Sequence, residues 1–215
     1  MSTIANHSFA RFIPALVMSV MLVGAPAAAQ VAMPTFTPIE TPTTARTSVF
    51  VDQIGERNST SIEQTSPAQK ATISQDGSDN MISLEQEDGG SHIAVIGQDG
   101  DGNEVRIGQT GLGETIANLR QTGDGNSVLL AQNNNGTIAT AAEIVQSGSS
   151  NSIELVQDGE DNQARLTQNG DNNTLTASQL GAGNRLEWVQ DGSGLSDMTV
   201  EQTGGQAMYI LQTNM

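Results

Sequence analysis

The sequence has no cysteine, few aromatic residues and little proline, and each shortage narrows the class of protein. The lack of cysteine excludes disulfide bonds and thiolate metal sites. Aromatic residues make up 3% of the 215 residues, which is too little for an ordinary globular core of this length. Proline is absent after Pro67. Any β-sheet in this part therefore lacks one device that commonly prevents an edge strand from pairing with another chain.

Basic residues are also scarce. The formal net charge is −16, and the part from residue 40 onward holds all 24 acidic residues against seven basic ones. This balance argues against binding of nucleic acid or of an anionic membrane through charge. We interpret the acidic residues as solvated turn residues that keep an aggregation-prone chain soluble.

No group of residues combines a nucleophile with a base. His7 lies in the N-terminal segment, so His92 is the remaining histidine, and we predict that it is a polar core residue. Acidic pairs such as Asp158 and Asp161 fall in predicted turns. The sequence therefore predicts neither an enzyme nor a cofactor or metal site.

The N-terminal part of the chain, before the first glutamine repeat, differs from the rest. Residues 1–29 have the pattern of a secretory signal peptide: Arg11, an apolar stretch over 12–24, and a small-residue cleavage site at 27–29. That apolar stretch is short for a membrane span, so we expect none in the mature form. Residues 30–48 are rich in threonine and proline and predict a flexible leader, which serves either as an address for a secretion channel or as a spacer.

Glutamine recurs at a nearly constant interval throughout residues 49–215, which we interpret as a repeat array. The sequence numbers of successive glutamines differ by 11 in nine of the fourteen intervals, by 12 in three, by 14 in one and by 10 in one. The residues two and four places before each later glutamine are apolar in 27 of 28 cases. This alternation predicts one β-strand with a single buried face in each unit. The periodic glutamines are Gln53, Gln64, Gln75, Gln86, Gln98, Gln109, Gln121, Gln132, Gln146, Gln157, Gln168, Gln179, Gln190, Gln202 and Gln212.

Asparagine often lies six places before a periodic glutamine. Because six is an even number, its side chain is expected on the same inward face of the strand as the glutamine. These positions are Asn58, Asn80, Asn103, Asn126, Asn151, Asn162, Asn173 and Asn184. Glycine recurs two residues after the glutamine, as at Gly159, where a tight turn favours a positive φ. Buried amides need partners, so we predict that each glutamine or asparagine stacks on its equivalent one layer away, in the amide ladders known from cross-β structure.

The core positions alternate between two strand types. Strands with a small and a large apolar residue, such as Ala164 and Leu166, follow strands with two large ones, such as Ile153 and Leu155. The true repeat is therefore about 22 residues. We predict an all-β, amyloid-like β-solenoid of about seven stacked strand-turn-strand coils with two facing parallel sheets, roughly 30–35 Å long at a strand spacing of ~4.8 Å.

Residues 157–168 carry a specific motif. Gln157, Gly159, Asn162, Ala164 and Gln168 match all five marked positions of the curlin repeat, Gln-x-Gly-x-x-Asn-x-Ala-x3-Gln. The chain thus resembles the subunits of curli, the bacterial amyloid fimbriae. The resemblance implies secretion through an outer-membrane pore, then polymerisation with itself and with a related curlin subunit into cell-surface fibres for adhesion and biofilm matrix. The array has about seven repeats rather than the five that are familiar in this family, and several alanine positions of the family motif hold Leu, Met or Val. These departures leave open whether the chain is a major fibre subunit or a minor, nucleating one.

Two other functions fit parts of the pattern. The turns at 99–103 and 124–126 are similar to calcium loops, but calcium-binding β-rolls use a nine-residue repeat. A monomeric β-solenoid that binds ice or sugar needs a regular outward column of side chains. The column three places before the glutamines in one sheet is irregular, reading Thr72, Val95, Asn118, Glu143, Arg165 and Glu187.

Overall fold

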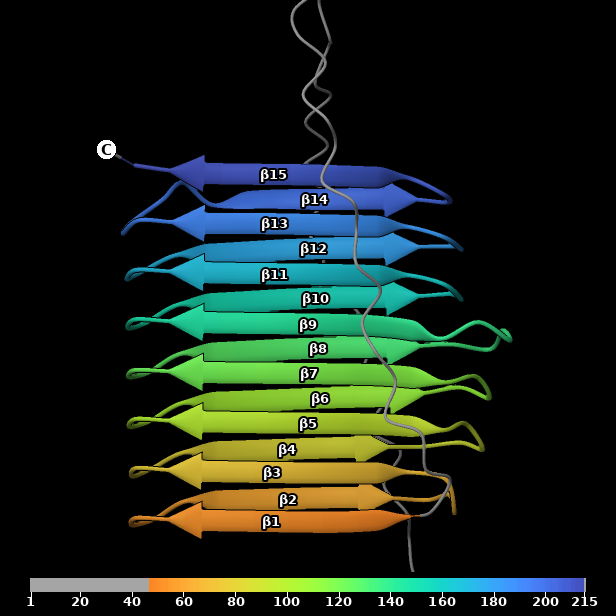
Figure 1. Ribbon diagram of the computed structural model, residues 1–215, viewed down its shortest axis with the longest axis horizontal. Helices are drawn as coiled ribbons and strands as arrows, with labels where there is room; N and C mark the ends of the chain where they lie inside the picture. Colours follow the sequence, from red (N-terminus) through yellow and green to blue (C-terminus); the bar gives the residue numbers. More distant parts are fainter. Residues whose placement is uncertain (1–46, 215) are drawn as a thin grey trace, which may run out of the picture. The chain divides into compact units, whose positions relative to one another are not determined.

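The computed structural model describes residues 47–214, which form fifteen β-strands (Figure 1). The predicted signal peptide (1–29) and almost all of the leader (30–48) lie outside the described residues. The strands are β1 (Ser48–Ile54), β2 (Ser59–Gln64), β3 (Lys70–Asp76), β4 (Met81–Gln86), β5 (His92–Asp99), β6 (Glu104–Thr110), β7 (Thr115–Thr122), β8 (Ser127–Asn133), β9 (Thr140–Ser147), β10 (Ser152–Asp158), β11 (Gln163–Asn169), β12 (Thr174–Leu180), β13 (Arg185–Asp191), β14 (Met198–Thr203) and β15 (Ala207–Thr213).

The strands alternate between two sheets. Odd-numbered strands form an eight-stranded sheet in the order β1 to β15, and even-numbered strands form a seven-stranded sheet from β2 to β14. Neighbours within each sheet are parallel, and the two sheets run in opposite directions (Figure 1). With two strands per coil, fifteen strands make seven and a half coils. The predicted all-β solenoid of about seven coils is confirmed.

The periodic glutamines set the register of both sheets. Gln53 pairs with Gln75 in one sheet, and Gln157 pairs with Gln179 in the other. A shift by one residue would turn every buried side chain outward, so the alternating pattern holds this register. The 14-residue interval after Gln132 is absorbed in a longer turn, and the strand phase resumes at Thr140, where β9 begins.

The core lies between the two sheets and is built as the strand types predict. The small residues of the eight-stranded sheet and the large residues of the seven-stranded sheet are buried in one cluster: Ala71, Ala94, Ala117, Ala142 and Ala164 on one side, and Ile82, Val105, Val128, Ile153 and Leu175 on the other. Trp188, two places before Gln190, is fully buried in β13. Its Nε1 donates a hydrogen bond of 3.0 Å to Oε1 of Gln212.

Glycine in the turns lets successive coils approach closely. Gly159 has a positive φ, and a Cβ added there would collide with the carbonyl oxygen of Gly181 in the next coil. A residue with a side chain would therefore be strained by its conformation and would also clash with the neighbouring turn. The glycine at this position keeps the turns spaced like the strands.

Candidate functional site

The periodic glutamines form two continuous ladders of side-chain hydrogen bonds, one at the end of each sheet's strands. In each bond, Nε2 of one glutamine donates to Oε1 of its equivalent one coil nearer the C-terminus. Apart from the first bond, from Gln53 to Gln75, the distances are 2.7–2.9 Å. Both ladders therefore point in the same direction along the array, with carbonyl oxygens toward the N-terminal coil.

The amides from Gln86 to Gln202 also make a second hydrogen bond, which crosses to the backbone of the facing sheet. Nε2 of Gln109 donates to the backbone oxygen of Ile93 at 3.1 Å, and Nε2 of Gln157 donates to that of Ala141 at 3.1 Å. The glutamine thus uses both of its N–H groups, one along the sheet and one across the core. The sequence did not reveal this second bond, because no spacing rule says which backbone group lies opposite the amide.

The asparagines join side chains to backbone as well as to each other. Oδ1 of Asn80 accepts the backbone N–H of Asn103 at 3.0 Å and its side-chain Nδ2–H at 3.1 Å. Nδ2 of Asn103 then donates to the carbonyl of Gly123 in the next turn at 2.7 Å. The same bond to the turn of the following coil is made by every predicted asparagine except Asn184, so these side chains hold successive turns in place.

The eight predicted asparagines separate into two files, one for each sheet. Six precede strands of the seven-stranded sheet: Asn58, Asn80, Asn103, Asn126, Asn151 and Asn173. The other two, Asn162 and Asn184, precede strands of the eight-stranded sheet and bond to each other at 2.9 Å. The same position in the other coils of that sheet holds residues such as His92, Thr115 and Thr140, which are also buried.

His92 is a buried core residue, as predicted. Its Nε2 lies 2.7 Å from the backbone oxygen of Glu87, and its Nδ1 lies 2.8 Å from Oγ1 of Thr115. A carbonyl oxygen can only accept, so the proton of the neutral ring is on Nε2 and Nδ1 accepts from the threonine. Burial lowers the pKa of His92, which favours this neutral form.

The ladder residues of the terminal coils are not buried like those between them. Gln53 is exposed, and Asn58, Gln64 and Gln212 are half-buried, whereas the periodic glutamines from Gln75 to Gln202 are buried. These terminal ladder residues keep their register and their inward positions, but they are not buried, because no further coil covers them. Met198, four places before Gln202, also occupies an inward position of the repeat, but it is 39% exposed in β14, the edge strand of its sheet.

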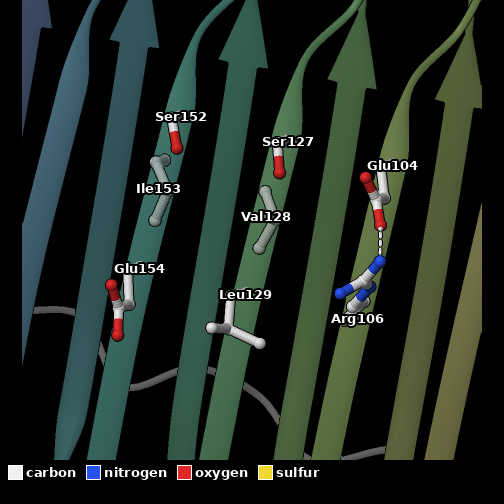
Figure 2. Close-up of a pocket in the computed structure, with 8 residues that line it drawn as sticks. All are labelled: Glu104, Arg106, Ser127, Val128, Leu129, Ser152, Ile153 and Glu154. Carbon is white, nitrogen blue, oxygen red and sulfur yellow. Dashed lines mark ion pairs between the residues drawn. The ribbon is translucent and has the colours of Figure 1, made fainter. Parts of the chain in front are cut away.

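The outer faces of the sheets were searched for a pocket and for metal-binding groups among the described residues. A shallow hollow on the outer face of the seven-stranded sheet is lined by Glu104, Arg106, Ser127, Val128, Leu129, Ser152, Ile153 and Glu154 (Figure 2). Its one ion pair joins Arg106 to Glu104. Within 47–214, no group of three acidic, histidine or cysteine residues could hold a metal ion, and no helix could span a membrane.

A family model described as the curlin associated repeat matches residues 48–87 and 148–181. In these two stretches the sequence numbers of successive periodic glutamines differ by 11, whereas the part between them includes differences of 12 and 14. The coil is nonetheless the same in all three parts. Neither a curated protein nor a solved structure matches the chain.

Proposed function

We propose that the chain is a structural subunit of curli-like amyloid fibres outside the cell, because the curlin associated repeat matches two stretches of it and its fold is a β-solenoid. Subunits stack end to end, so that the terminal coil of one continues into the first coil of the next. The proposed role in the cell is adhesion and formation of the biofilm matrix, without catalysis. The proposed partners of the chain are further copies of itself, a related curlin subunit and an outer-membrane secretion pore.

The observation that carries this proposal is the complementarity of the two ends. At the N-terminal end, Oε1 of Gln53 and of Gln64 accepts no hydrogen bond from a described residue. At the C-terminal end, Nε2 of Gln212 makes its bond across the core, to Ser196 O at 3.1 Å, and donates to no glutamine among the described residues. Acceptors at one end and donors at the other are what a further copy of the same chain would satisfy.

The core is also open at both ends. Val49 and Val51 in β1 are 52% and 40% exposed although they occupy the inward positions of the repeat. Met208 occupies an inward position in β15 and is 39% exposed. Burial of such apolar surface would favour association, and an exposed, unprotected edge strand is a template for pairing with another chain.

The direct test is assembly of the purified chain at micromolar concentration. We expect fibres that bind thioflavin, shorten the lag phase when added as seeds, and give a fibre-diffraction reflection near ~4.8 Å along the fibre axis. A chain that stays monomeric for days, without thioflavin binding even when seeds are present, would refute the proposal.

A further inference from the structure

We infer that neighbouring subunits in a fibre of this protein are related by about a half-turn around the fibre axis. This inference rests on the proposed end-to-end assembly and specifies the joint, by which we mean the contact between the last strands of one subunit and the first strands of the next. The observation behind it is the odd number of strands: the described array has fifteen, and both its first and last strands, β1 and β15, lie in the eight-stranded sheet.

The geometry follows from the alternation of strands between the sheets. Because β15 completes the eight-stranded sheet, the next strand position of the solenoid lies in the other sheet, on the edge of β14. An incoming β1 that continues the solenoid must occupy this position. In its own subunit β1 belongs to the eight-stranded sheet, so the incoming subunit has to be turned to bring β1 over β14.

A half-turn preserves the strand directions. The two sheets run in opposite directions on opposite sides of the solenoid (Figure 1). Rotation by a half-turn around the long axis exchanges the two sides and reverses the direction of each strand in space. The incoming β1 therefore lies parallel to β14, and the incoming β2 lies parallel to β15, as parallel pairing within each sheet requires.

A joint without rotation would leave a defect. Placing β1 directly on β15 would leave an empty strand position between β14 and the incoming β2, a gap of about twice the usual ~4.8 Å spacing. The backbone N–H and C=O groups along both of these edges would stay without strand partners. The half-turn joint pairs all four edge strands.

The side chains are compatible with this joint. With the periodic glutamines kept in register, Gln202 would precede Gln53 of the next subunit in one ladder, and Gln212 would precede Gln64 in the other. Within its own subunit Nε2 of Gln202 makes the crossing bond to Arg185 O at 2.9 Å, but in place of the ladder bond it has a contact of 3.3 Å to Gln206 O.

The same register covers the open core. Val49 and Val51 would lie over Met198 and Val200, while Thr60 and Ile62 would lie over Met208 and Ile210, each at equivalent positions of the repeat. The common direction of the ladders also excludes head-to-head joints, because these would bring the carbonyl oxygens of two N-terminal ends together.

Engineered disulfides distinguish the two joints, since the natural chain has no cysteine. The half-turn joint places the outward residues Tyr209 and Ser61 side by side, whereas the joint without rotation places Tyr209 beside Phe50. Neighbouring strands at ~4.8 Å allow a disulfide. We would compare the double variants Ser61→Cys/Tyr209→Cys and Phe50→Cys/Tyr209→Cys after oxidation of assembled fibres, with each single variant as a control. All three residues are exposed, and Tyr209 lies at the opposite end of the array from the other two, so a bond within the chain is excluded.

We expect covalent multimers on a non-reducing denaturing gel from the Ser61/Tyr209 pair, at least tenfold more abundant than from the Phe50/Tyr209 pair. Dominant cross-linking of the Phe50/Tyr209 pair, or of neither pair in fibres that bind thioflavin, would overturn the half-turn joint and leave the proposed assembly standing. Cryo-electron microscopy of unmodified fibres gives an independent answer: successive subunits rotated by about a half-turn support the joint, and rotation near zero refutes it. If the unmodified chain forms no fibres, the proposed function itself fails.

Discussion

Replacing Gln157 with leucine tests the amide ladders most directly. Gln157 is fully buried. Its Oε1 accepts from Gln132 at 2.8 Å, and its Nε2 donates to Gln179 at 2.7 Å and to the backbone of Ala141 at 3.1 Å. Gln157→Leu leaves at least two buried side-chain groups without partners, the N–H of Gln132 and Oε1 of Gln179. At about 1–3 kcal/mol for each group, the variant should lose roughly 2–6 kcal/mol of stability.

A second substitution in the same ladder should cost less than the first. Gln157→Leu and Gln179→Leu remove the same shared bond, so the double variant should be more stable than the sum of the two losses by roughly 1–3 kcal/mol. Gln168 lies in the other ladder and bonds to Gln190 and Gln146. Adding Gln168→Leu to Gln157→Leu should therefore be nearly additive.

Gln163→Leu is the matched control, because it is the same change at an outward position. Gln163 is half-buried in β11, and its Oε1 has no hydrogen-bond partner among the described residues. Its replacement should change stability by no more than about 0.5 kcal/mol, as should Glu154→Ser on the exposed face. The readout is the midpoint of guanidinium unfolding, followed by the circular dichroism of the β-sheets. Equal losses for Gln157→Leu and Gln163→Leu would refute the assignment of inward amides as the ladder.

Three further predictions address the turns, the core histidine and the joint. Gly159→Ala should lose roughly 1–3 kcal/mol or more from backbone strain and collision, whereas Gly108→Ala, where an added Cβ meets nothing within 4 Å and φ is not positive, should be neutral or stabilising in the same unfolding assay. Because burial lowers the pKa of His92 from its usual 6.5, the unfolded chain takes up the proton first, and stability should fall as pH drops below about 6.5. His92→Asn should remove this fall, and an unchanged pH profile would contradict the neutral buried ring. Glu201→Gln should speed fibre elongation up to a few-fold at low salt by removing a like-charge neighbour of Asp52 across the half-turn joint, worth about 0.2–1 kcal/mol; Glu154→Gln, the same charge change in the middle of the array, should act less.

The sequence alone determined the strands, the two sheets and the pairing of glutamines one coil apart. It could do so because the side-chain direction alternates with every residue, so a fixed interval between apolar pairs and glutamines defines both the buried face and the neighbour above. Even the 14-residue interval after Gln132 disturbs only a turn, since the pattern of β9 resumes at Thr140.

Only the tertiary structure decided where the second N–H group of the buried amides goes and which ladder residues remain exposed. The crossing bond from Gln157 to Ala141 O depends on the distance between two sheets, which no interval along the chain encodes. The exposure of Gln53 and Val49 depends on where the stack ends, because an inward residue is buried only when a further coil covers it. For the same reason, the position of β15 in the sheet that also contains β1 determines how a second copy can fit.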